Sequence, residues 1–258
     1  MHKIDIDKII EISKEAGKIA MRFYGRDYLI EEKENKTPVT EADLNINDFL
    51  MKELSKFGYP ILSEESEDDF EKRKEADYVW VIDPLDGTSD FVQKTGEFAI
   101  MIGLVENKTG ESVLGVVFAP ALKELYFGQK GRGSFMCHSE FISESQKITV
   151  SQKKLEGGKI LVSRNHLGEY EQEVAKKYNV TQMPMGSAGL KICRIARGDA
   201  ELYINSSDKS GIWDICAGDV ILREAGGEIA DLNKNIIFYN KKNIVLKHGY
   251  RVLNGFKF

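Results

Sequence analysis

Apolar side chains recur at helical spacing near the start of the chain. They would share one face of a helix with about 3.6 residues per turn. These positions are Ile9, Ile12, Ala16, Ile19, Ala20 and Phe23. Gly25 then predicts the end of this helix. The same spacing returns over residues 41–54, so the pattern predicts a second amphipathic helix there.

Short apolar runs bounded by turn residues follow, and they are typical of strands. The predicted strands of this part are residues 59–62, 78–82, 98–105, 113–119 and 124–127. The sequence Asn-Lys-Thr-Gly at 107–110 predicts a hairpin. Residues 128–145 are rich in glycine, serine and charge, and we interpret them as a surface loop.

Strand and helix patterns alternate more evenly in the second half. Strands are predicted at 159–163, 180–185 and 201–204, and helices at 168–178, 188–197 and 213–224. The whole pattern indicates an α+β protein. The composition shift near 128–147 suggests two α+β halves, 1–135 and 136–258.

Composition limits the function classes. The 258 residues include 36 Lys plus Arg and 41 Asp plus Glu, for a net charge of −5. This balance argues against binding of a nucleic-acid polymer, which favours a basic face. It allows a small phosphorylated substrate if metal ions supply local positive charge. The three cysteines lack metal-site spacing, and we expect them to be reduced and mostly buried.

The N-terminus has no apolar signal-peptide core, and no apolar run is long enough to span a bilayer. We therefore expect a cytoplasmic protein, either free or peripheral at the cytoplasmic face of the inner membrane. We expect it to be a monomer or a homodimer.

The segment 83–88, Asp-Pro-Leu-Asp-Gly-Thr, is the centre of the candidate chemistry. It follows the apolar run 78–82, and its proline and glycine predict a tight turn at the end of a strand. Asp83 and Asp86 could aim two carboxylates and a carbonyl at one point, as a hard divalent cation requires. An ordinary Asp-Gly turn explains the same residues equally well.

Three more carboxylates occupy comparable positions. Glu64 follows the predicted strand 59–62, so two strand ends present acids. Asp214 and Asp43 each lie in the first turn of a predicted helix, where a carboxylate can simply stabilise the helix dipole. The two strand ends that present acids make a metal site more credible than either strand end alone.

Four ordered motifs resemble the inositol monophosphatase superfamily of Mg²⁺-dependent, lithium-sensitive phosphatases. They are Pro-Val-Thr-Glu-Ala-Asp at 38–43, Ser-Glu-Glu at 63–65, the segment 83–88 and Trp-Asp at 213–214. The segments 94–98, 115–120, 163–166, 186–191 and 249–252 are most similar to CysQ-type 3'(2'),5'-bisphosphate nucleotidases, which act in sulfur metabolism. The pair Ser89-Asp90 departs from the Lys-Glu that is commoner in those nucleotidases. The resemblance implies a layered αβαβα sandwich of the sugar-phosphatase type.

The resemblance also implies a metal centre with two or three Mg²⁺ ions. One ion would be held by Glu64, Asp83 and the Leu85 carbonyl, with help from Thr88. A second would be held by Asp83, Asp86 and Asp214, so that Asp83 bridges the two ions. The 1–135 half would then carry most of the ligands, and the 136–258 half would carry Asp214 and the residues of substrate specificity.

The same resemblance assigns substrate contacts. The implied set is Glu64, Leu85, Asp86, Gly87, Thr88, His166, Ser187, Lys191 and Asp214. Of these, His166, Ser187 and Lys191 would contact the nucleotide. By residue type alone, His166 fits an ordinary loop histidine as well, and Lys191 fits a solvated lysine on a helix.

The implied reaction is hydrolysis of the 3'-phosphate of adenosine 3',5'-bisphosphate, or of its sulfated form. Thr88, hydrogen-bonded to Asp43, and Glu64 would orient and deprotonate the attacking water. An inositol or sugar monophosphate is the alternative substrate. A non-catalytic protein that binds divalent cations is the alternative of a different class, although the spacing of segment 83–88 does not match an EF-hand.

Overall fold

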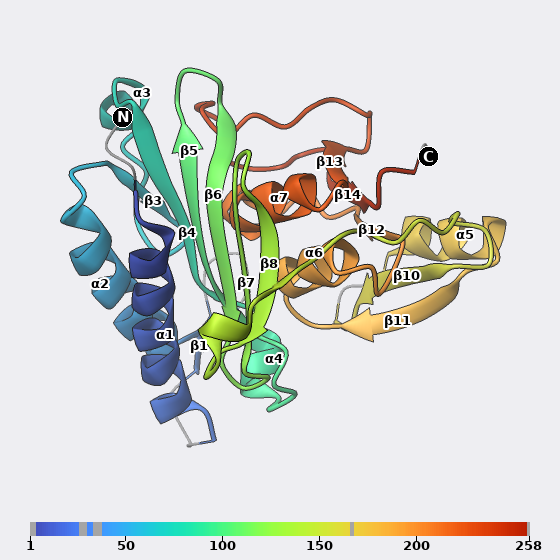
Figure 1. Cartoon of the computed structure of the whole chain (residues 1–258), viewed down its shortest axis with the longest axis horizontal. Helices are drawn as coiled ribbons and strands as arrows, with labels where there is room; N and C mark the ends of the chain where they lie inside the picture. The colour runs from blue at the N-terminus through green and yellow to red at the C-terminus, as the bar shows by residue number, and fades with distance from the viewer. Residues whose placement is uncertain (1–3, 26–29, 33–37, 166–167, 257–258) are drawn as a thin grey trace.

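The computed structural model describes residues 4–25, 30–32, 38–165 and 168–256. Five layers follow one another: two helices, a seven-stranded sheet, two helices, a five-stranded sheet and one helix (Figure 1). This arrangement confirms the predicted αβαβα sandwich. Within the described residues, no helix has the length and apolar character needed to cross a membrane.

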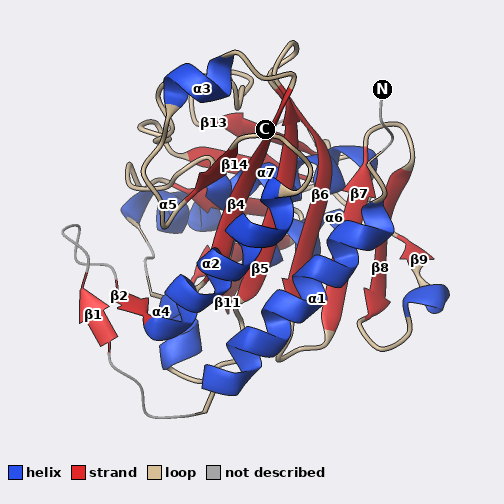
Figure 2. Ribbon diagram, turned by 90° about the vertical axis from the view of Figure 1, so that its left-hand side faces the viewer, coloured by secondary structure: helices blue, strands red, loops and turns tan. Residues whose placement is uncertain are grey.

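Two helices form the first layer. Helix α1 (Ile6–Phe23) and helix α2 (Glu41–Ser55) pack against each other and lie across one face of the large sheet (Figure 2). Their buried side chains, among them Ile9, Ala16 and Leu50, are the apolar positions that the helical spacing predicted. A short hairpin of β1 (Ile30–Glu32) and β2 (Pro38–Thr40) lies between them in the sequence.

The seven-stranded sheet is antiparallel except for its first pair, which is parallel. In spatial order its strands are β3 (Ile61–Ser63), β4 (Tyr78–Asp86), β5 (Ala99–Glu106), β6 (Glu111–Ala119), β7 (Glu124–Gln129), β8 (Gly133–His138) and β9 (Gln146–Lys147). Helix α3 (Phe70–Lys74) connects β3 to β4, and helix α4 (Thr88–Val92) connects β4 to β5. The predicted hairpin at 107–110 joins β5 to β6.

Two predictions in this region are wrong. Strand β4 continues through Asp86, whereas the sequence predicted its end at Ile82. Its register with β5 is irregular between Asp83 and Asp86, so Pro84 is accommodated at a point where no regular ladder donor is needed. The predicted surface loop 128–145 contains β8, which pairs with β7 over six residues, and a turn of 3₁₀ helix at Ile142–Glu144.

The middle layer consists of helix α6 (Ala188–Ala196) and helix α7 (Trp213–Glu224). Both start at the predicted positions, and α7 packs against α6 and on β6 and β5 of the large sheet. Gly115 of β6 permits this approach, because a Cβ there would lie 2.0 Å from the carbonyl oxygen of Ala217. The buried cysteines Cys193 and Cys216 lie in this layer, as expected.

The second sheet and one helix complete the sandwich. The strand order is β11 (Thr181–Met185), β10 (Lys159–Ser163), β12 (Leu202–Asn205), β14 (Tyr250–Leu253) and β13 (Glu228–Asp231). Strand β10 is parallel to both of its neighbours, whereas β14 is antiparallel to both of its own. Helix α5 (Glu169–Lys177) covers the outer face through Val174 and Ala175.

Candidate active site

Residues 83–86 form the last part of β4, and the turn that the sequence predicted within segment 83–88 is at Gly87. The amide of Leu85 donates to Asp83 Oδ1 at 3.0 Å, which fixes the carboxylate against its own backbone. Gly87 adopts φ 90° and ψ 39°, a left-handed conformation that strongly favours glycine. The chain then enters α4 at Thr88. The irregular end of β4 and the turn at Gly87 therefore direct the carboxylates of Asp83 and Asp86 away from the sheet.

Three of the four predicted carboxylate ligands converge. Glu64, Asp83 and Asp214 each offer an oxygen, and these oxygens lie within 4.8 Å of one another. Glu64 is brought beside β4 because its amide donates to the carbonyl of Ile82 at 3.3 Å. Asp214 is oriented by the amide of Gly211, which donates to its Oδ2 at 3.0 Å. Residues 150 positions apart in sequence therefore form one acidic cluster.

The cluster is electrostatically unfavourable without a cation. Burial raises the pKa of Asp83 well above its ordinary value, and the carboxylates of Glu64, Asp86 and Asp214 raise that pKa further. The pKa of Asp214 is raised for the same reasons, with burial first and Glu64 next. Only 1% of Asp83 is exposed. Oxygen donors held together against their repulsion match a hard divalent cation.

The fourth carboxylate, Asp86, faces the start of α6. Its Oδ2 accepts from the Ser187 hydroxyl and from the amide of Gly189 at 2.7 Å, and its Oδ1 accepts from the amide of Ala188 at 3.0 Å. Burial raises the pKa of Asp86, while Ser187, Lys191 and these amides oppose the increase. Within the part of the chain that the structure describes, Oδ1 receives one donor, so it retains a lone pair that can bind a cation.

The predicted hydrogen bond between Thr88 and Asp43 is present. Thr88 Oγ1 lies 3.2 Å from Asp43 Oδ1 and 3.1 Å from the carbonyl oxygen of Leu85. A hydroxyl has a single proton, so it donates to one of these oxygens at a time. Asp43 lies in the first turn of α2 and is 2% exposed. In this position Asp43 can both stabilise the dipole of α2 and contact Thr88, the two roles that the sequence suggested.

Lys191 is buried, contrary to the solvated position that its residue type suggested. It is 3% exposed, and its Nζ donates to the carbonyl of Met185 at 3.2 Å. The ammonium also lies 4.9 Å from the centre of the Tyr203 ring. Burial lowers the pKa of Lys191 to about 8, although Asp86 and other nearby carboxylates favour the charged form. A buried cation therefore lies beside the acidic cluster.

Comparison with known proteins decides the family. The model of the inositol monophosphatase family matches residues 5–255. This chain belongs to that family. Among its relatives is the 3'(2'),5'-bisphosphate nucleotidase CysQ of Aggregatibacter actinomycetemcomitans, 34% identical over 242 residues, which cover 92% of this chain and 88% of that protein. CysQ of Salmonella typhimurium is 30% identical over 251 residues, covering 96% of this chain and 98% of that protein.

Solved structures of the inositol monophosphatase family agree with the fold. CysQ from Bacteroides thetaiotaomicron superposes with a TM-score of 0.83 at 28% identity, and the match covers 99% of each chain. The inositol monophosphatase of Thermotoga maritima gives a TM-score of 0.80 at 28% identity, covering 97% of this chain and 92% of that one. The layered sandwich is therefore the fold of this family.

Sequence reasoning missed one polar network at the site. Arg164, Asp90 and Glu97 form ion pairs beside the turn that precedes α6. Arg164 and Glu97 lie in segments that resemble nucleotidases, and Asp90 lies in the pair that departs from them, but neither signal assigned these residues a role. The predicted nucleotide contact His166 lies outside the described residues.

Proposed function

We propose that this family member is a Mg²⁺-dependent phosphatase that converts adenosine 3',5'-bisphosphate to AMP and phosphate. The acidic cluster of Glu64, Asp83 and Asp214, next to the Thr88–Asp43 pair, is the observation that carries the proposal. The names of the relatives support the choice of substrate, because CysQ proteins are described as 3'(2'),5'-bisphosphate nucleotidases. The sulfated form of the substrate belongs to the same proposal.

The residues present fit a magnesium centre. One ion would be held by Glu64, Asp83 and the Leu85 carbonyl, and another by Asp83, Asp86 and Asp214. All of these donors are oxygens, and the raised pKa values of Asp83 and Asp214 show how strongly the cluster disfavours its own negative charge. When bound, Mg²⁺ neutralises charge on the phosphoryl oxygens and makes water a better nucleophile.

The protein's own groups then position the reactants. Glu64 and the Thr88–Asp43 pair orient a water molecule for in-line attack on phosphorus and accept its proton. The bond between phosphorus and the ribose 3'-oxygen breaks, and that oxygen takes up a proton as AMP leaves. The backbone at Gly87 and Thr88 holds the phosphoryl group that is transferred. The site therefore acts mainly by orientation and charge, as phosphoryl transfer requires.

The residues beside α6 would supply specificity. Lys191 and the Ser187 hydroxyl lie next to Asp86, so they are placed to contact the part of the substrate beyond the reacting phosphate. A buried ammonium favours a ligand that carries a second anionic group. An inositol monophosphate has no such group. The Thermotoga relative named an inositol monophosphatase keeps that substrate as the second candidate.

A substrate panel separates the two candidates. We expect kcat/KM for adenosine 3',5'-bisphosphate to exceed that for inositol 1-phosphate. Lys191→Ala should reduce the former by ~10- to 100-fold, since a charged hydrogen bond is worth roughly 1.5–3 kcal/mol, and should affect the latter little. Lys177→Ala, on the exposed face of α5, is the matched control. Equal losses on both substrates would contradict the nucleotidase assignment.

Asp86→Ala tests whether the carboxylates act in the reaction. We expect it to abolish phosphate release, whereas Asp199→Ala, a carboxylate at the far end of α6, should not. Tight Ca²⁺ binding by calorimetry with no hydrolysis of either substrate would instead favour a non-catalytic cation-binding protein.

A further inference from the structure

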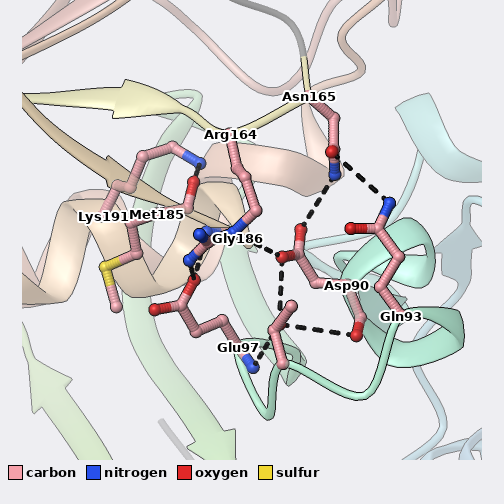
Figure 3. Close-up of polar contacts among 9 residues, drawn as sticks. Asp90, Gln93, Glu97, Arg164, Asn165, Met185, Gly186 and Lys191 are labelled. Carbon is pink, nitrogen blue, oxygen red and sulfur yellow. Dashed lines mark hydrogen bonds and ion pairs between the residues drawn. The ribbon is translucent and has the colours of Figure 1, made fainter.

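Arg164 links the end of a strand in the five-stranded sheet to a connection between two strands of the seven-stranded sheet. It follows β10, and its side chain points at two carboxylates of the connection between β4 and β5, Asp90 in α4 and Glu97 in the loop after it (Figure 3). Its Nη2 donates to Glu97 Oε2 at 2.5 Å, and its Nε donates to Asp90 Oδ1 at 3.2 Å. Asn165 adds a contact of 3.4 Å to Asp90 Oδ2. One guanidinium thus binds both acids of the connection between β4 and β5.

The same two acids hold the turn before α6. Glu97 Oε2 also accepts from the amide of Gly186 at 2.8 Å, so this single oxygen receives both the guanidinium and a backbone donor (Figure 3). Asp90 packs against the other side of the turn, because a Cβ at Gly186 would lie 2.3 Å from Asp90 Cγ. In addition, the amide of Arg164 donates to the carbonyl of Met185 at 3.3 Å. The turn is therefore held on both sides.

The turn is strained in a way that requires such support. Ser187 has φ 54° and ψ 123°, an uncommon conformation for a residue with a Cβ. Such a conformation is strained and persists where the surroundings fix it. Ser187 begins α6, accepting from the amide of Leu190 at 3.1 Å and donating to Asp86 Oδ2. The geometry of this turn therefore decides where the carboxylate of Asp86 points.

We propose that Arg164 is a positioning residue, which acts through Glu97 and Gly186 to hold the Ser187 turn and thereby to orient Asp86 toward the metal centre. The proposal rests on the proposed function, because Asp86 is given its metal-binding role there. The Arg164 side chain is partly exposed, so water screens the charge of its ion pairs. Arg164 therefore contributes mainly by geometry. It fixes the position of Glu97 Oε2, and that oxygen also accepts from the amide of Gly186.

The variant Arg164→Ala tests the proposal by two readouts. We expect its kcat to fall ~10- to 100-fold and its affinity for Mg²⁺, measured by titration calorimetry with Mg²⁺ alone, to fall by a similar factor, as changes behind a metal ligand typically do. Arg164→Lys keeps the positive charge but lacks the planar guanidinium that binds two acceptors at once. Its kcat and Mg²⁺ affinity should therefore lie between those of the wild type and of Arg164→Ala.

Arg197→Ala is the matched control. This arginine caps the opposite end of α6, has two acidic partners, Asp199 and Glu124, and has a side-chain exposure of 27% against 36% for Arg164. We expect it to leave kcat and Mg²⁺ affinity unchanged within ~2-fold, because it does not touch the Ser187 turn. Equal effects of both alanine variants would overturn the proposal.

A double-mutant cycle identifies the route of the coupling. If Arg164 acts through Asp86, then Arg164→Ala should change Mg²⁺ affinity by less than ~2-fold in an Asp86→Asn background. The same fold-loss in both backgrounds would show that Arg164 acts elsewhere. If Arg164→Ala fails to fold, Arg164→Lys is used in the same cycle. A wild type that binds Mg²⁺ but hydrolyses nothing contradicts the proposed function, whereas a normal wild type with an unaltered Arg164→Ala contradicts the positioning role alone.

Discussion

At the scale of single residues, the site depends on side chains whose partners and burial cannot be predicted from the local sequence. Segment 83–88 predicted the turn and its carboxylates, since proline and glycine restrict the backbone locally. Sequence alone did not show that Asp86 faces the start of α6, because its partners Ser187 to Gly189 lie about 100 residues away. The burial of Lys191 was missed for a similar reason, since a helical pattern does not reveal that sheets cover both sides of α6.

Thr88 should be essential for the chemical step rather than for folding. We expect Thr88→Ala to lower kcat by ~10²- to 10⁴-fold, the range for losing a positioned proton acceptor, with little change in KM. Thr88→Ser keeps the hydroxyl that reaches Asp43 and should retain most of the activity. Steady-state kinetics of the two variants provide the measurement. An alanine variant as active as the serine variant would remove Thr88 from the proposed reaction.

The acidic cluster should make metal-free stability depend on pH. Because the pKa values of Asp83 and Asp214 are raised in the folded chain, that chain binds more protons than the unfolded one as pH rises above the ordinary value of 3.8. The free energy of unfolding without metal should therefore fall from that pH up to the raised pKa values. Asp83→Asn should flatten the fall. Denaturant midpoints measured in chelator over this range check both statements.

Metal binding should reverse this dependence. Because the ligands must be ionised, Mg²⁺ affinity should increase with pH, and binding should release protons. Calorimetry in buffers of different ionisation enthalpy counts the protons released. Binding that releases none, at any pH below the raised pKa values, would contradict the assignment of this cluster as the metal site.

At the scale of elements, strand pairing determines the bounds of two strands that the local sequence pattern did not predict. The predicted loop 128–145 has no clean alternation, and β8 exists because six of its residues pair with β7. Strand β4 extends beyond its predicted end because its irregular register with β5 accommodates Pro84. The helices with strong periodicity, α1 and α6, were predicted at nearly their observed bounds, since an amphipathic helix carries its own signal.

The close packing of α7 on the large sheet should be required for both stability and metal binding. Gly115→Ala would place a Cβ 2.0 Å from the carbonyl of Ala217, so α7 must shift. We expect a loss of ~1–3 kcal/mol in the free energy of unfolding, and a lower Mg²⁺ affinity because α7 carries Asp214. Gly131→Ala is the control: its Cβ meets no atom within 4 Å, so only its φ of 74° costs stability. The prediction is wrong if Gly115→Ala binds Mg²⁺ normally.

At the scale of the whole molecule, the fold gathers residues from three successive layers at one point. Asp43 comes from α2, Asp83 from β4 and Asp214 from α7, which lies between the sheets. The family resemblance predicted this convergence, whereas composition and periodicity alone left an ordinary turn equally acceptable. The proposed halves 1–135 and 136–258 stay a prediction, and β8 and β9 extend the first sheet to Lys147. The peripheral membrane location has no support from these findings.

The most direct measurement is phosphate release from adenosine 3',5'-bisphosphate by the purified protein, with Mg²⁺ and after its removal by a chelator. We expect release with Mg²⁺, none in chelator, recovery on adding Mg²⁺ back, and none at any Mg²⁺ concentration for Asp83→Asn. Release that persists in chelator, or in Asp83→Asn at the wild-type rate, would contradict the claim that this acidic cluster is a metal-dependent phosphatase site.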